Sequence, residues 1–535
     1  MGIKVLIVGK GLTGLVAAWQ LLEKSDKKEI EIEIVSDGAG ASPYVHGFNV
    51  PLHPKDTVEI FKEDTLRGGY GLSNPRLVDC LCEDSVAIPD MLETLQVFLE
   101  KKDGAYKLLK PLGSTWPRVT GSGNQTGAEI MNRLNALLKS RTEVHFTPSA
   151  RALRLDIQEG KVQGVVLWNK AKEQLEYRKA DIVLLASGGF CGIYPFSTNS
   201  VDSGGDGIAM AYEAGALLTD MEFIQFEPSV ALYPEGVRGK SVITTMFYEG
   251  AVLRNGKQER FMKPEGSESA GECVGKDILS RAIYKEMREG TPTKHGGVYF
   301  DATGVGYEKL IESYESYVDR YKKVGVDIAK QPFEIAPGAH TSLGGVVVGT
   351  SCETNIKGLF AAGEVMGGLH GANRVGGNAG LETLVFGKRA ADGICNYLKA
   401  VEENLVESDC IHTLTESENL PTMNAEELVE IRKKMEQLLQ DHLFVIRNGE
   451  DLKKTVTSLE EMKNDVRTHG CPEHLYEKLR LENDLICADL LARAALARTE
   501  SVGCHVRSDS DEGDWHYHVM LQKDEKGNTK IWKES

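Results

Sequence analysis

The sequence predicts an α/β fold in which a Rossmann-like unit is assembled from separated segments of the chain. An apolar strand at 4–8 runs into Gly9-x-Gly11-x-x-Gly14 and then into a helical stretch. Strand-to-glycine segments recur at 181–189 and 358–364, and charged amphipathic helices replace them beyond about residue 425. A chain of 535 residues is long enough for two or three such domains.

The first segment reads as a β-α-β unit, with its second strand at 31–35. Its glycines allow a tight turn and let backbone N–H groups approach a pyrophosphate at the start of the helix. The turn predicts cofactor contacts at Gly9, Gly11, Leu12, Thr13 and Gly14. Ser36 and Asp37 follow the second strand and are candidates for the ribose, although Asp37 could equally cap a turn.

The two later segments extend the same site. The strand at 181–186 leads into Ser187-Gly188-Gly189, and a small-residue helix follows Gly205-Asp206-Gly207. Glu364 comes directly after the short strand and glycine at 359–363. It is placed to bind a ribityl or ribose hydroxyl, with helix capping as the alternative.

Charge and cysteine usage exclude several classes of partner. Sixty-two basic against 79 acidic side chains give a net charge of −17, which opposes binding to nucleic acid or to anionic membranes. The apolar run near the start is too short for a signal peptide or a spanning helix, so we expect a cytoplasmic protein with no membrane insertion. Ten scattered cysteines without a C-x-x-C array predict no metal site.

Five ordered motifs carry a family resemblance: the N-terminal glycine turn, Gly205-Asp206-Gly207, 221–226 (MEFIQF), 361–364 (AAGE) and 370–374 (HGANR). With them the chain resembles the flavoprotein subunits of succinate dehydrogenase and fumarate reductase, and L-aspartate oxidase. The resemblance implies an FAD-binding domain at 1–226 and 338–400, with an inserted α+β capping domain at 227–337. It also implies a C-terminal helical domain at 425–507, and the alternating residues at 508–535 predict a tail hairpin.

The resemblance implies four catalytic candidates. Arg374 matches the arginine that binds the substrate carboxylate, and His340 matches a substrate-contacting histidine. Two positions depart from the family. Glu227 stands where the family has a histidine, and its negative charge would repel a second carboxylate of the substrate. Lys276 stands where the family has the proton-shuttling arginine. Lysine has a lower intrinsic pKa than arginine but cannot bind a carboxylate with two parallel hydrogen bonds.

The same resemblance implies a bound FAD. Further cofactor contacts are expected at Ser42, Gly47, Ser187, Gly188, Asp206, Asn378, Ala379 and Leu381. Succinate dehydrogenases attach FAD through a histidine, but the matching position here is Ala41, so we expect non-covalent FAD. His46 stands where the family has glutamine, and either a flavin contact or a structural role would explain it.

Three functions are consistent with these residues. The first is an FAD-dependent oxidoreductase that transfers hydride between flavin N5 and a carboxylate-conjugated C=C bond or its saturated product, with a substrate that could differ from fumarate. The second is an amino-acid oxidase like L-aspartate oxidase. The third is a catalytically lapsed electron-relay protein. The family implies a partner that carries iron–sulfur clusters, and an independent enzyme with a soluble carrier is the alternative.

Overall fold

A five-stranded parallel sheet forms the centre of the computed structural model, which describes residues 2–24, 30–38, 40–200, 202–262, 271–400, 420–510 and 513–535. The sheet has the order β18-β11-β1-β2-β7, with every neighbouring pair parallel. Its strands are β1 (Ile3–Val8), β2 (Ile30–Ser36), β7 (Val144–Pro148), β11 (Ile182–Leu185) and β18 (Leu359–Ala361). All five carboxyl ends therefore meet at one edge, where ligands of open α/β sheets bind.

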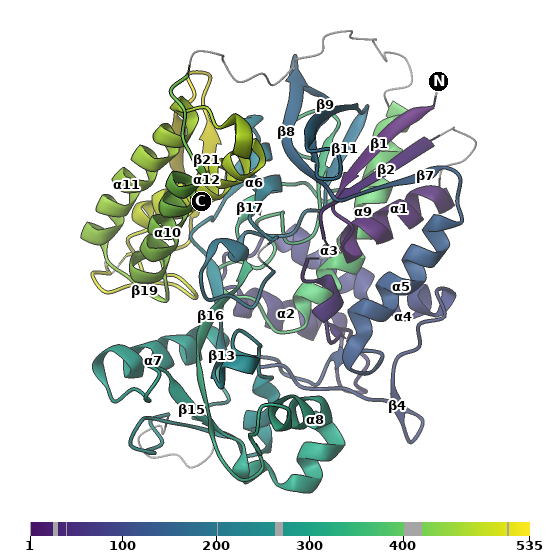
Figure 1. The fold of residues 1–535 in the computed structure, drawn as a ribbon. Helices are drawn as coiled ribbons and strands as arrows, with labels where there is room; N and C mark the ends of the chain where they lie inside the picture. Colours follow the sequence, from purple (N-terminus) through teal and green to yellow (C-terminus); the bar gives the residue numbers. More distant parts are fainter. Residues whose placement is uncertain are drawn as a thin grey trace.

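Helices cover this sheet (Figure 1), and its strands β1, β11 and β18 are largely buried. Helix α1 (Leu12–Lys24) packs along α9 (Asn378–Ala400), although more than 350 residues separate them in the chain. Helix α5 (Thr126–Lys139) packs on α1. A three-stranded antiparallel sheet of β8 (Ala150–Gln158), β9 (Lys161–Asn169) and β10 (Gln174–Lys179) is inserted before β11.

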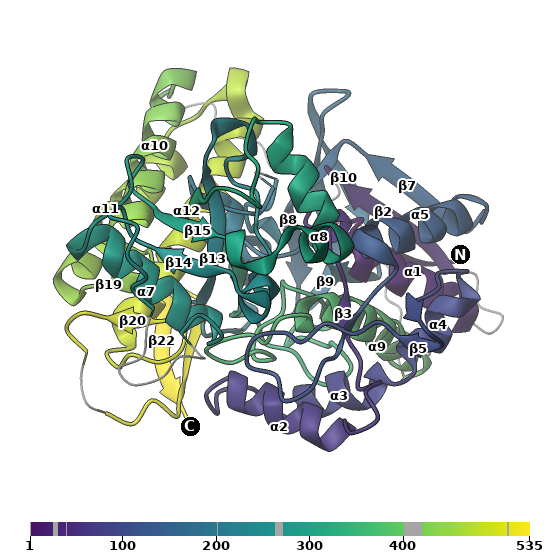
Figure 2. The same cartoon turned by 90° about the horizontal axis from the view of Figure 1, so that it is seen from below.

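Residues 227–337, called the capping segment, lie below the parallel sheet in Figure 1 and face the viewer in Figure 2. Its antiparallel sheet has the order β13-β16-β15-β14. The strands are β13 (Ile224–Tyr233), β14 (Val252–Arg254), β15 (Val298–Asp301) and β16 (Phe333–Ser342), and the helices are α7 (Lys276–Glu289) and α8 (Tyr307–Lys322). Buried residues between 231 and 335, joined by Leu112, form a separate hydrophobic core. Long strands β13 and β16 thus connect this core to the rest of the molecule.

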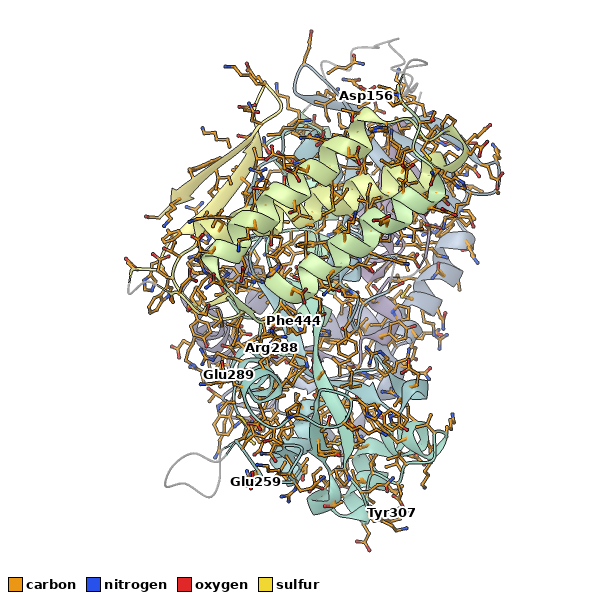
Figure 3. The ribbon with its side chains drawn as sticks, turned by 60° about the vertical axis from the view of Figure 1, so that its left-hand side comes forward. Asp156, Glu259, Arg288, Glu289, Tyr307 and Phe444 are labelled. Carbon is orange, nitrogen blue, oxygen red and sulfur yellow. The ribbon has the colours of Figure 1, made fainter. Side chains whose placement is uncertain are left out.

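The C-terminal helices α10 (Ala425–His442), α11 (Gly449–Thr468) and α12 (Leu475–Ala497) pack against one another. Phe444, which follows α10, lies where these helices meet the capping segment (Figure 3). Its ring centroid is 4.6 Å from that of Phe226 and 5.4 Å from that of Tyr284. The C-terminal helices therefore contact the base of the capping segment through an aromatic cluster.

The tail strands β21 (His518–Lys523) and β22 (Thr529–Glu534) pair antiparallel around a turn at 524–528. They do not stand alone. Strand β21 pairs with β12 (Leu218–Thr219), and β12 pairs with β17 (Gly345–Val346). The C-terminus thus completes a four-stranded sheet beside the segment that leads into β13.

The remaining elements are short and connect these layers. The helices are α2 (Val58–Gly68), α3 (Pro75–Ser85), α4 (Ile88–Thr94) and α6 (Asp206–Glu213), and the strands are β3 (Phe48–Asn49), β4 (Lys101–Lys102), β5 (Ala105–Tyr106), β6 (Val119–Thr120), β19 (Ile446–Arg447) and β20 (Val506–Arg507). None of the helices in the described part of the chain has the length and apolar composition needed to cross a membrane.

Arg498, which follows α12, joins the tail to the start of β13. Its fully buried guanidinium donates to Glu222 Oε1 at 2.6 Å and to the Tyr517 carbonyl at 2.7 Å. Burial raises the pKa of Glu222 to about 7, and Arg498 opposes that shift. Removing one partner of a buried pair leaves the other charge uncompensated.

We therefore expect Arg498→Met to lower the free energy of unfolding by about 3–5 kcal/mol, because Glu222 loses its counter-charge. Denaturant unfolding followed by tryptophan fluorescence measures this. Lys453→Met removes an exposed cation whose side chain is 62% accessible, and it should change stability by less than about 0.5 kcal/mol. Equal denaturant midpoints of unfolding for the two variants would contradict the stabilising role of the buried Arg498–Glu222 pair.

Candidate active site

A cavity of about 840 Å³ runs from the carboxyl edge of the parallel sheet to the capping segment. Its inner part is lined by the residues that follow β1, β2, β11 and β18. Its outer part is lined by residues of β13, β16, α7, α8 and the loop at 238–245. The parallel sheet and the capping segment thus share one site.

The inner part has the features of a nucleotide cradle. Gly9 has a φ of +115°, and a Cβ there would lie 2.2 Å from the Ala186 carbonyl oxygen, so only glycine lets these two strand ends meet. A Cβ on Gly188 would contact nothing within 4 Å, which leaves open space at the end of β11. The buried Ser187 hydroxyl has no hydrogen-bond partner in the described part of the chain. Unfilled space and an orphaned hydroxyl fit a bound polar cofactor.

Glu364 also lies in this cradle, where it is half-buried. Its Oε1 accepts from the Ser342 backbone N–H at 3.1 Å. Burial raises the pKa of Glu364 to about 7, and the Ser342 hydrogen bond opposes the shift. A carboxyl group in this setting suits a hydroxyl partner better than an anion.

Most of the predicted cofactor residues lie on the cavity wall: Gly9, Gly11, Thr13, Ser36, Ser42, Gly47, Ser187, Gly188, Asp206, Glu364 and Ala379. Four others do not line it: Leu12, Gly14, Asn378 and Leu381. Leu12 and Leu381 pack in the core, although the Leu12 backbone N–H donates to Ser42 Oγ at 2.9 Å. Asn378 bonds to Asn49 and Thr65, so its side chain fixes the start of α9.

The carboxylates of Asp206 and Asp37 are already bound by protein groups. Asp206 accepts from Arg151 Nε and from Asn483 Nδ2, both at 2.8 Å. Asp37 lies 2.8 Å from Lys170 Nζ and also accepts from Tyr476 at 3.1 Å. Sequence reasoning linked both aspartates to the cofactor, whereas in the structure their carboxylates tie the cradle to neighbouring elements.

Arg374 is the most exceptional group in the outer part of the cavity. It is buried, yet its guanidinium has no ion pair or hydrogen bond to any described residue, and its Nε is an orphaned buried donor. Burial lowers the pKa of Arg374. Gln225 fixes the loop by donating to the Arg374 carbonyl at 2.9 Å. A buried arginine held in place without a counter-ion is suited to an incoming carboxylate.

Glu227 and Lys276 form an ion pair between β13 and the first residue of α7. Both side chains are largely buried and both line the cavity. Burial lowers the pKa of Lys276, and Glu227 opposes the shift. The sequence predicted that Glu227 would repel a second carboxylate, and the structure adds that Lys276 partly neutralises it.

His340 lies on β16 with its Nδ1 2.7 Å from the Thr198 hydroxyl and its Nε2 3.9 Å from Glu227 Oε2. Burial, together with Lys276 and Arg374, lowers the pKa of His340 well below its usual range. The imidazole is therefore neutral at physiological pH. If Nδ1 accepts from Thr198, Nε2 carries the proton and donates into the cavity.

Two wall residues on α8, Tyr317 and Arg320, are absent from the sequence-based site. The Tyr317 ring centroid is 6.5 Å from that of His46, which also lines the cavity. The helical pattern of α8 was visible in the sequence, but it does not reveal which side of the helix faces a cavity built by other segments.

The fold and the cavity together define a flavoprotein oxidoreductase. The family described as "FAD binding domain" matches residues 4–379, and the one described as "Fumarate reductase flavoprotein C-term" matches residues 432–535. The chain belongs to this fumarate reductase and succinate dehydrogenase flavoprotein family. It is an FAD-dependent oxidoreductase, so the predicted fold class, family and cofactor are confirmed.

The relatives cover essentially the whole chain. One subunit of fumarate reductase (CoM/CoB) from Methanothermobacter marburgensis is 34% identical, over 97% of each chain. L-aspartate oxidase from Saccharolobus solfataricus is 33% identical, over 96% of this chain and 97% of that protein. A solved structure of E. coli quinol fumarate reductase FrdA superposes with a TM-score of 0.88 at 26% identity, covering 100% and 97% of the two chains.

We predict that the FAD is bound without a covalent link. Ala41, which lines the cavity just before Ser42, has no nucleophilic side chain to form such a link. Acid precipitation of the holoprotein should release essentially all of the flavin into the supernatant. Yellow, fluorescent protein in a washed pellet or a denaturing gel would contradict this prediction.

Proposed function

We propose that this chain reduces a C=C bond conjugated to a carboxylate, or oxidises the saturated product. The observation that carries the proposal is the unpaired, buried Arg374 at the outer end of the cofactor cavity, which needs an anion to compensate its charge. Lys276 and His340 line the same part of the cavity, so a carboxylate held by Arg374 lies beside groups that donate protons.

Each residue has a defined task in this proposal. Arg374 binds the carboxylate through its planar fork and orients the adjacent carbons. His340, neutral and held by Thr198, donates a hydrogen bond to the substrate. Lys276 supplies the proton that the substrate carbon receives, and Glu227 holds the ammonium group in position. Bound FAD supplies the hydride-transfer chemistry, and residues 227–337 act as the cap that excludes water.

Anaerobic titration of the reduced holoenzyme tests the proposal. Unsaturated acids should reoxidise the flavin, as followed by its visible absorbance. The corresponding amides should do so at least about 100-fold more slowly, because they present no charge to Arg374. Reoxidation by amides at the same rate would refute carboxylate recognition. A panel of acids that all fail would refute the reaction class.

An amino-acid oxidase is the second candidate, favoured by the 33% identity to an L-aspartate oxidase and by Glu227 in the cavity. In this reading Glu227 binds a substrate ammonium group. The Lys276 ammonium already forms an ion pair with Glu227, which leaves this carboxylate less available to a substrate ammonium group. The ion pair therefore supports the reduction of a C=C bond over amino-acid oxidation. Release of hydrogen peroxide from aerobic enzyme supplied with L-amino acids would establish the second.

We also propose that electrons pass to or from a separate protein. The Methanothermobacter relative is named as one subunit of its enzyme, which supports a multisubunit assembly. An iron–sulfur subunit is the proposed partner, and a soluble carrier is the alternative. Purification from the native host distinguishes them, because the subunit would bring iron and sulfide in fixed ratio to flavin.

A further inference from the structure

A tyrosine outside the capping segment contacts the helix that carries Lys276. Tyr70 follows α2 and donates its hydroxyl to Asp277 Oδ2 at 2.5 Å, across 207 positions of the chain. Asp277 is the second residue of α7 and directly follows Lys276, which lines the cavity. The hydrogen bond therefore links the cofactor-binding part of the molecule to the end of α7 that reaches the cavity.

The turn that carries Tyr70 is packed tightly on the loop of Arg374. The Ala372 backbone N–H donates to the Gly69 carbonyl at 3.0 Å. A Cβ on Gly371 would lie 2.4 Å from the same carbonyl oxygen, so no larger side chain fits between the two segments. Tyr70 has a left-handed backbone with a φ of +58°, which a bulky residue adopts only where its surroundings require it. The Tyr70 hydroxyl is thus held in a fixed place relative to Arg374.

Asp277 depends on this hydroxyl for its hydrogen bonding. The residue is 9% exposed, and its Oδ1 has no hydrogen-bond partner in the described part of the chain. Burial raises the pKa of Tyr70 above its usual value, and the charge of Asp277 adds to the shift. The phenol therefore keeps its proton and remains a donor at physiological pH. A buried carboxylate without a donor is costly, so the pair holds the first turn of α7 in place.

The other polar contact of α7 has a different direction. Ser280 Oγ donates to the Phe226 carbonyl at 3.0 Å, about one turn farther along the helix, and this bond ties α7 to β13. It fixes the helix on the sheet of the capping segment. The Tyr70 contact instead ties the helix to the turn that packs on the Arg374 loop, and it acts beside Lys276.

We propose that Tyr70 is a positioning residue for the reduction: by holding Asp277, it places the neighbouring Lys276 ammonium beside a carboxylate substrate bound at Arg374. The inference rests on the proposed function, in which Lys276 supplies the proton, and extends it to a residue that does not line the cavity. Its physical basis is distance, because a misplacement of about 1 Å can cost about 10²-fold in rate.

Tyr70→Phe removes the hydroxyl and keeps the ring. Anaerobic stopped-flow reoxidation of the reduced holoenzyme is measured with fumarate, crotonate, acrylate and cinnamate, and the acid that reacts fastest with the wild type is used throughout. We expect Tyr70→Phe to lower the limiting rate constant about 10–100-fold. The dissociation constant of the corresponding saturated acid for the oxidised enzyme should stay within about twofold, because Arg374 and the backbone of the turn are unchanged.

Tyr177→Phe is the matched control. Tyr177 donates to Asp156 Oδ2 at 2.8 Å between β10 and β8, neither residue lines the cavity, and Asp156 is 9% exposed, as is Asp277. Each variant loses one tyrosine–aspartate hydrogen bond, so we expect similar decreases in thermal midpoint but a slower reoxidation only in Tyr70→Phe. Asp277→Asn keeps an acceptor for the Tyr70 hydroxyl and should retain more of the rate than Tyr70→Phe.

A double-variant cycle tests whether Tyr70 acts through Lys276. In the Lys276→Met background, Tyr70→Phe should change the remaining rate by less than about twofold, because the group that it positions is absent. In the wild-type background the same substitution should have its full effect. This difference separates a positioning role from a general weakening of the fold.

The failures are distinguishable. A wild-type rate in Tyr70→Phe, or the same fractional loss in both backgrounds, would overturn the positioning role and leave the proposed function intact. A wild-type rate in Lys276→Met would refute the proton donor and, with it, this inference. If none of the four acids reoxidises the wild-type flavin, the reaction class is refuted and the inference falls with it.

Discussion

Arg374→Lys is expected to lower kcat/KM by at least about 100-fold although the charge is retained. A guanidinium binds a carboxylate with two parallel hydrogen bonds. A lysine ammonium is a point charge, and its side chain places that charge at a different distance from the backbone. Two decades correspond to about 2.7 kcal/mol of transition-state stabilisation. Steady-state kinetics with the acid that reoxidises the wild-type flavin fastest measures the effect.

The Arg374 variant needs a control for cofactor loss, since its loop leads into α9 and lines the cavity. The ratio of flavin absorbance to protein should match that of the wild type, because the Arg374 side chain makes no hydrogen bond or ion pair to any described residue of the cradle. Full flavin content with unchanged kinetics would remove Arg374 from substrate binding. Loss of flavin would assign it a structural role.

Lys276→Met is expected to reduce kcat by about 10²–10⁴-fold while FAD stays bound, because the variant removes the proposed proton donor and no cofactor contact. The substitution also leaves Glu227 buried without its counter-charge. The double variant Lys276→Met with Glu227→Gln removes that imbalance. It should recover the thermal stability of the wild type but not its turnover, and recovered turnover would show that Lys276 acts only by pairing Glu227.

The lowered pKa of Lys276 also leads us to expect that the rate of reduction falls at alkaline pH. Burial lowers the pKa of Lys276 from its usual value, and only the protonated form donates. The rate should therefore be highest below that lowered pKa and fall as the pH rises through it. In Lys276→Arg the limit should move to higher pH, because the guanidinium pKa exceeds 12. A pH profile of kcat that is unchanged by the substitution would contradict the assignment.

Local pattern predicted the strands β1, β2, β11 and β18 of the parallel sheet, because each carries its own signal, whereas the edge strand β7 was not predicted. The strands before Gly9 and Ser187 are short apolar runs that end in glycine or serine, and Glu364 follows the third. Motif order then placed Arg374, His340, Lys276 and Glu227, and the structure brings all four to one cavity.

What the sequence did not predict depends on tertiary contacts. No spacing rule shows that Lys276 reaches Glu227 across 49 positions, or that Asp206 accepts from Arg151 and Asn483. The contribution of Tyr317 and Arg320 depends on how the capping segment is placed over the cavity. Their periodicity is equally consistent with an ordinary amphipathic helix.

The strand order of the parallel sheet also determines how late during translation the sheet can be completed. Strand β18 pairs beside β11, and α9 packs on α1, so the cradle is completed by residues 359–400. During translation at about 5–20 residues per second, the N-terminal β-α-β unit therefore waits tens of seconds with part of its apolar surface uncovered. Cofactor capture and closure of this surface are late, coupled events. We therefore expect the yield of folded protein to depend on flavin supply and chaperone capacity in the expression host.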